Sequence, residues 1–221
     1  MALVNHDTRE VQFKIVYCGP AYSGKTTNLQ HIHERLGAEE RGDLLSMATS
    51  TDRTVFFDYL PIDSVLIQDY HTRFQLYTVP GQAAYNATRQ LVLRGVDAIV
   101  FVADSGPDRI EDNAQALRTV AENLEKNNPG STLQDLPLVL QYNKRDVPGA
   151  IARDHLDMVL NGGPKQLQVF ETVAAQGINV FATLNAVAQE TIARFHAANR
   201  DVSAAPATSA PQTQPELAAT A

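Results

Sequence analysis

Residues 19–26 combine the residue types that bind the phosphates of a nucleotide. Their sequence, GPAYSGKT, fits the pattern G-x-x-x-x-G-K-S/T. Glycines let the backbone turn its N–H groups inward, where they cradle phosphate oxygens. Lys25 supplies a positive charge for the β- and γ-phosphates, and the Thr26 hydroxyl is the expected Mg²⁺ ligand. We therefore predict a phosphate site built from Gly19, Ala21, Tyr22, Ser23, Gly24, Lys25, Thr26 and Thr27.

Residues 143–146, with the sequence NKRD, carry the side chain needed to select guanine. The two acceptor oxygens of Asp146 match the N1–H and N2 amine of guanine, whereas adenine presents an acceptor at N1. Asn143 and Lys144 are expected to brace this loop against the phosphate loop and the base. The pattern is weak alone, but behind an upstream phosphate loop it strongly favours a guanine nucleotide.

Composition and charge exclude several other classes of protein. The chain of 221 residues has 18 basic and 25 acidic side chains, a net charge of -7, and no dominant basic patch, so nucleic acid is not an expected partner. The single cysteine, Cys18, excludes a disulfide framework and a multi-cysteine metal site. The longest apolar run, residues 98–103, is too short to cross a bilayer. We expect a cytoplasmic protein without a membrane anchor of its own.

Apolar strand patterns alternate with helical patterns, which indicates an α/β fold. A mostly parallel sheet of six to seven strands, with helices on both faces, is expected. Ligands of such sheets bind beyond the carboxyl ends of the strands, where both motifs fall. The expected strands are 11–18, 55–60, 73–79, 97–103, 136–143 and 168–172, and the expected helices are 26–36, 108–126, 151–160 and 179–199. Residues 201–221 are rich in Ala, Pro and Thr and lack aromatic side chains, which predicts a disordered tail.

Three further segments give the sequence a close resemblance to a known family. These are residues 50–58 (STDRTVFFD), 78–82 (TVPGQ) and 93–97 (LRGVD). The order of phosphate loop, x-x-x-G-Q and N-K-x-D is that of Ras-like small GTPases, and the segments together resemble the bacterial MglA GTPases over about residues 5–198. The resemblance implies a Ras-like G domain over residues 1–200, of the P-loop NTPase class. It also implies binding of GTP, GDP and Mg²⁺, hydrolysis of GTP, and control of cell polarity and of gliding or pilus-driven motility.

The resemblance also implies roles for individual residues. Thr54 would bind Mg²⁺ and the γ-phosphate in the GTP state, and Gly81 would offer its backbone N–H to the γ-phosphate. Gln82 would orient the attacking water, and Arg53 would act as an arginine finger supplied in cis. The implied partners are an MglB-type roadblock homodimer, which stimulates a slow GTPase without contributing an arginine, and polarity or motility effectors. Such partners would recruit the protein to the cell poles.

Three positions depart from the Ras-like pattern. A methyl group at Ala21, where glycine is usual, would point toward the γ-phosphate, and we therefore expect slow hydrolysis. Thr78 replaces the usual magnesium-side aspartate; Asp52 or Asp58 is available to support the ion through water, and the sequence does not choose between them. The loop at residues 173–175 lacks the usual lysine, although the backbone N–H of Ala174 is expected to donate to guanine O6.

Two alternative functions stay open at the level of sequence. A guanine-nucleotide-binding interaction module that does not hydrolyse GTP is favoured by Ala21 and disfavoured by Arg53 and Gln82. A P-loop ATPase or kinase is disfavoured by Asp146.

Overall fold

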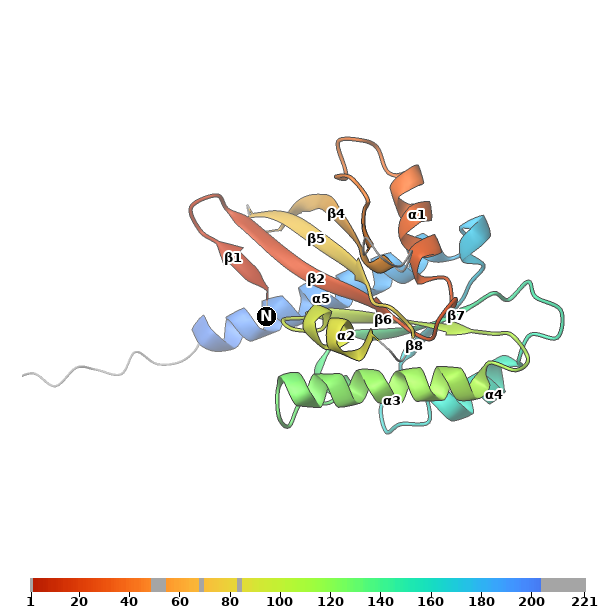
Figure 1. Ribbon diagram of the computed structural model, residues 1–221. Helices are drawn as coiled ribbons and strands as arrows, with labels where there is room; N and C mark the ends of the chain where they lie inside the picture. Colours follow the sequence, from red (N-terminus) through yellow and green to blue (C-terminus); the bar gives the residue numbers. More distant parts are fainter. Residues whose placement is uncertain (1, 49–54, 68–69, 83–84, 204–221) are drawn as a thin grey trace, which may run out of the picture.

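The computed structural model describes residues 2–48, 55–67, 70–82 and 85–203 (Figure 1). Within these residues, eight strands form one mixed sheet in the order β3-β4-β5-β2-β6-β7-β8, with β1 beside β2. The strands are β1 (Leu3–Asn5), β2 (Glu10–Cys18), β3 (Leu45–Ala48), β4 (Val55–Ile67), β5 (Tyr70–Thr78), β6 (Ala98–Asp104), β7 (Leu138–Asn143) and β8 (Gln168–Glu171). The helices are α1 (Lys25–Arg35), α2 (Asn86–Val92), α3 (Ile110–Asn127), α4 (Arg153–Leu160) and α5 (Val180–Ser203), with short 3-10 turns η2 (Leu133–Asp135) and η3 (Ala174–Gln176).

The sheet is parallel in its centre and on one side. β2 pairs in parallel with β5 and β6, β6 with β7, and β7 with β8, whereas β3, β4 and β5 form an antiparallel meander. Every residue of β6 and β7 is buried, as expected for central strands covered on both faces. The carboxyl ends of β2, β6 and β7 therefore meet at one edge of the sheet, where the predicted motifs begin.

Helices cover both faces of the sheet, as predicted. One core cluster joins apolar side chains of α1 and α5 to one face, and a second joins α2, α3 and α4 to the other (Figure 1). Side chains alternate between the two clusters along β2: Phe13, Ile15 and Tyr17 enter the first, whereas Val16 and Cys18 enter the second. In the part of the chain that the structure describes, no helix is long and apolar enough to cross a membrane.

The predicted strand count of six to seven was too low. All six expected strands are present, but β1 and β3 were missed, and β4 continues to Ile67 rather than ending near residue 60. β1 and β3 contain only 3 and 4 residues, too few to show a period of two. α2, with 7 residues, was also missed, because it is too short to show a clear helical period of 3.6 residues. α5 continues to Ser203, past the predicted boundary at residue 200, and residues 204–221 lie outside the described part.

Candidate nucleotide-binding site

The phosphate loop connects the end of β2 to the first turn of α1. Gly19 and Gly24 have φ angles of +139° and +100°, which side chains rarely tolerate. A Cβ atom would lie 2.1 Å from the Val102 carbonyl oxygen at Gly19, and 2.2 Å from Asn143 Nδ2 at Gly24. Both glycines of the motif are therefore required by close packing against β6 and against the predicted guanine loop.

Lys25 lies inside this loop. Its Nζ donates hydrogen bonds to the carbonyl oxygens of Pro20, at 2.6 Å, and of Gly19, at 3.2 Å. Burial lowers the pKa of Lys25 to about 8. A cavity of about 190 Å³ beside it is also lined by Ala21, Tyr22, Thr26, Gly81 and Gln82. The structure thus brings Lys25 and Thr26 together with Gly81 and Gln82 around one cavity, whereas Gly24 and Thr27 line another cavity.

Asp58, on β4, completes this cavity with a buried carboxylate that is 1% exposed. Its Oδ2 accepts hydrogen bonds from Thr26 Oγ1 at 2.6 Å and Thr78 Oγ1 at 2.9 Å, while its Oδ1 accepts from Ser46 Oγ at 2.8 Å. Its backbone N–H donates to Thr78 Oγ1 at 2.8 Å. The Asp58 carboxylate thus lies against Thr26, the predicted metal ligand, whereas Asp52 falls outside the described residues.

Three residues of the predicted guanine loop, Asn143, Lys144 and Asp146, line a second cavity of about 240 Å³. Gly24, Thr27 and Ala174 also line it. Asn143 braces the loop as predicted, because its Nδ2 donates to the Ser23 carbonyl oxygen at 2.7 Å. Its Oδ1 accepts from the Ala174 N–H at 2.9 Å. The contact that we predicted between that N–H and guanine O6 would therefore have to compete with Asn143.

Lys144 has a partner that the sequence did not predict. Its Nζ lies 2.7 Å from Oδ2 of Asp104, a residue at the end of β6 that is only 4% exposed. Lys144 also adopts a left-handed backbone conformation, with φ of +62°. The lysine of the guanine loop is thus paired with a buried carboxylate.

Tyr22 stands where the two cavities adjoin. It lines both of them, its side chain is 80% exposed, and its φ of +65° is uncommon for a bulky residue. The phosphate-side and base-side cavities therefore share Tyr22 as a lining residue. This arrangement suits a nucleotide whose ribose lies between its base and its phosphates.

The segment that contains Gly81 and Gln82 is held from behind by Arg89 of α2. The Arg89 guanidinium donates to the carbonyl oxygens of Pro80, at 3.1 Å, and Gln82, at 2.9 Å, and burial lowers its pKa. Gly81 lies so close to the phosphate loop that a Cβ atom there would be 2.2 Å from the backbone nitrogen of Ala21. The side chain of Gln82 is exposed beside the phosphate cavity.

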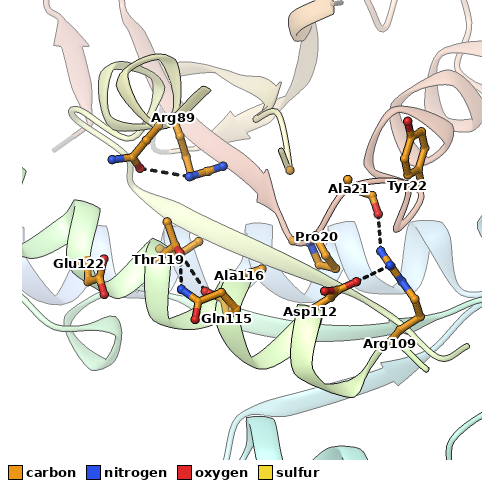
Figure 2. Close-up of a pocket in the computed structure, with 14 residues that line it drawn as sticks. Pro20, Ala21, Tyr22, Arg89, Arg109, Asp112, Gln115, Ala116, Thr119 and Glu122 are labelled. Carbon is orange, nitrogen blue, oxygen red and sulfur yellow. Dashed lines mark hydrogen bonds and ion pairs between the residues drawn. The ribbon is translucent and has the colours of Figure 1, made fainter. Parts of the chain in front are cut away.

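A third cavity, of about 550 Å³, separates the phosphate loop from α2 and α3 (Figure 2). Arg89 borders it on the α2 side and Arg109 on the α3 side. Arg109 reaches the phosphate loop, because its Nη2 donates to the Ala21 carbonyl oxygen at 2.8 Å. The residues that line this cavity include Ala21 but none of the predicted guanine loop.

Some predicted residues lie outside the described part of the chain. These are Arg53 and Thr54, together with Asp52. Sequence reasoning missed three others that the structure places against the site, Arg89, Asp104 and Arg109, and it left Asp58 as one of two options. Two of these residues had a local sequence signal for a role in the site. Asp58 is a charged residue at an inward position of the alternating strand β4, and Asp104 is a charged residue at the end of the apolar strand β6.

The phosphate loop lies between β2, the first long strand, and α1, and the sheet is mainly parallel. Together with the guanine loop, this arrangement defines a P-loop NTPase of the Ras-like type. The chain matches the family model of the ADP-ribosylation factor family over residues 2–191, and it belongs to that family. It is 47% identical over 189 residues to the mutual gliding-motility protein MglA of Myxococcus xanthus (strain DK1622), a match that covers 86% of this chain and 95% of that protein. The predicted MglA-type resemblance is thereby confirmed. The protein is a small GTPase switch that binds GTP and GDP and hydrolyses GTP.

Proposed function

We propose that this GTPase controls cell polarity and motility through its GTP-bound state. The similarity to a protein named for gliding motility supports the motility role. The observation that carries the nucleotide assignment is the pair of adjoining cavities that share Tyr22, one lined by Lys25 and Thr26 and the other by Asp146. In this proposal the first cavity receives the β- and γ-phosphates and the second receives guanine.

The oxygen atoms around Asp58 fit a hard divalent cation. Mg²⁺ prefers oxygen ligands, and this cluster joins one carboxylate to the hydroxyl groups of Thr26, Thr78 and Ser46. Thr26, with Thr54, would hold Mg²⁺, and Asp58 would supply the carboxylate that Thr78 lacks. When bound, the ion would neutralise negative charge on the phosphates.

The protein's own residues would supply the positioning that phosphoryl transfer needs. Lys25 would bind the β- and γ-phosphates, Gly81 would donate its N–H to the γ-phosphate, and Gln82 would orient the water. Arg89 supports this arrangement, because it fixes the carbonyl groups on both sides of Gly81. Arg53 would add positive charge at the γ-phosphate, a contribution of about 10³–10⁵ in rate for an arginine finger.

The proposed regulator is an MglB-type roadblock homodimer. It would act by closing the segments that carry Arg53, Thr54 and Gln82 rather than by inserting an arginine of its own. Effectors would read the GTP state and recruit the protein to the cell poles. The alternative is a GTP-binding interaction module without hydrolysis, and the observation in its favour is the Ala21 methyl group at the wall of the phosphate cavity.

The test is the nucleotide bound to purified protein and its single-turnover hydrolysis, with and without a roadblock dimer. We expect bound GDP or GTP, displacement by GTP but not by ATP, and slow cleavage that the dimer accelerates. Arg53→Ala and Gln82→Ala should abolish the stimulated rate. Tight guanine binding without cleavage in either condition would favour the interaction module, and effective competition by ATP would refute the guanine assignment.

A further inference from the structure

The end of β6 and the start of α3 form a rigid platform beside the phosphate loop. Asn113, which is fully buried, accepts a hydrogen bond from the Asp104 N–H and donates one to the Asp104 carbonyl oxygen, both at 2.8 Å. These two bonds fix the first turn of α3 against the strand. Arg109 begins this turn, since its carbonyl oxygen accepts from the Asn113 N–H at 3.0 Å. A side chain that starts from such a platform is held in a defined place.

Arg109 uses this platform to reach the phosphate loop (Figure 2). Its Nη2 donates to the Ala21 carbonyl oxygen at 2.8 Å, its Nε lies 3.4 Å from Asp104 Oδ2, and its Nη1 pairs with Asp112. The same Asp104 oxygen lies 2.7 Å from Lys144 Nζ in the guanine loop. A continuous series of charged contacts therefore joins the guanine loop to the phosphate loop.

The contact with Ala21 sets the direction of a peptide group. The described chain contains no cis peptide bond, so the Ala21 carbonyl and the Tyr22 N–H point in opposite directions. The Arg109 guanidinium binds the Ala21 carbonyl, so the Tyr22 N–H of the same peptide points away from that guanidinium. Tyr22 lines the phosphate and base cavities as well as the third cavity. The left-handed conformation of Tyr22 is typical of backbone nests that bind anions.

We propose that Arg109 is a positioning residue for nucleotide binding: it holds the Ala21–Tyr22 peptide so that the Tyr22 N–H faces the β-phosphate, and through Asp104 it links this peptide to the guanine loop. The inference rests on the proposed assignment of the two cavities. Arg109 touches no nucleotide in this scheme, and it acts only through the peptide.

The experiment compares GDP with GMP, which keeps the guanine, the ribose and one phosphate but lacks the β-phosphate. Competition against a fluorescent GDP analogue gives the affinity for both nucleotides in wild type, Arg109→Met and Arg109→Lys. Arg118→Met is the matched control, because Arg118 lies on α3, the helix that Arg109 immediately precedes, and pairs with exposed Glu111. Circular dichroism establishes that each variant is folded.

We expect Arg109→Met to weaken GDP by about tenfold, as for loss of a charged hydrogen bond, and GMP by less than about twofold. Arg109→Lys keeps the charge but not the planar fork, so its GDP-to-GMP affinity ratio should fall by an intermediate factor. Arg118→Met should change neither affinity. Equal weakening of GDP and GMP, or the same loss in Arg118→Met, would overturn the proposal. If Arg109→Met does not fold, an unchanged ratio in Arg109→Lys would overturn it. Failure of the wild type to bind GDP would instead refute the proposed function.

Discussion

Moving a carboxylate between positions 58 and 78 tests whether Asp58 replaces the aspartate missing at Thr78. Thr78 Oγ1 lies 2.9 Å from Asp58 Oδ2, and both residues are buried, with exposures of 4% and 1%. Thr78→Asp would place a second carboxylate there. Two unit charges about 4 Å apart repel by about 4 kcal/mol at an effective dielectric constant of 20. Asp58→Asn would leave hydroxyl groups facing an uncharged amide, and each lost charged hydrogen bond costs about 1.5–3 kcal/mol.

The double variant, Asp58→Asn with Thr78→Asp, has one carboxylate again. We expect its free energy of unfolding to exceed the additive value by about 3 kcal/mol, because the repulsion in Thr78→Asp disappears. Urea unfolding in EDTA without nucleotide measures this coupling. In a second assay, Mg²⁺ should slow GDP release in the wild type and the double variant but not in Asp58→Asn. Additivity within about 0.5 kcal/mol would refute the shared site.

Three further predictions concern single positions. Gly81→Ala should reduce GTP hydrolysis at least about a hundredfold with GDP binding retained, because the new Cβ lies 2.2 Å from the phosphate-loop backbone; wild-type turnover would contradict this contact. Gly177 has a φ of +73°, and a Cβ atom added there would lie 2.0 Å from the His31 ring. Gly177→Ala should therefore lower the free energy of unfolding by at least about 1 kcal/mol, whereas Gly163→Ala, with open space around the new Cβ, should not. Burial raises the pKa of the Cys18 thiol to about 12, so a disulfide reagent should label it at pH 8 only as the protein unfolds; rapid labelling of folded protein would refute the burial. Above about pH 9 only the unfolded thiol ionises, and the stability of wild type relative to Cys18→Ala should fall by about 1.4 kcal/mol per pH unit.

The contiguous motifs were predictable because their chemistry is local. In the phosphate loop, Gly19 and Gly24 are required by backbone conformation, and Lys25 and Thr26 are set by their spacing from these glycines. The central strands were predictable for a related reason. A strand buried on both faces is apolar throughout, as in β6 and β7, whereas the short edge strands β1 and β3 carry little periodic signal.

The partners of the site residues depend on distant parts of the chain. Asp58 is 32 residues from Thr26, Lys144 is 40 from Asp104, and Arg109 is 88 from Ala21. No spacing rule connects such pairs. They meet only because β2, β6 and β7 end at one edge of the sheet, where the antiparallel strand β4 begins.

The position of the Asp58 carboxylate depends on strand register, which local sequence does not specify. The antiparallel pairing of β4 with β5 sets Tyr59 opposite Tyr77, which brings the neighbouring Asp58 against Thr78. A slip of one residue would turn the Asp58 carboxylate to the other face of the sheet. The sequence by itself therefore determined that the chain binds a guanine nucleotide, since that chemistry is written in contiguous residues. Only the folded sheet decided that Asp58 lies beside Thr26 and that Arg109 holds the phosphate loop, because those contacts depend on register and on strand order.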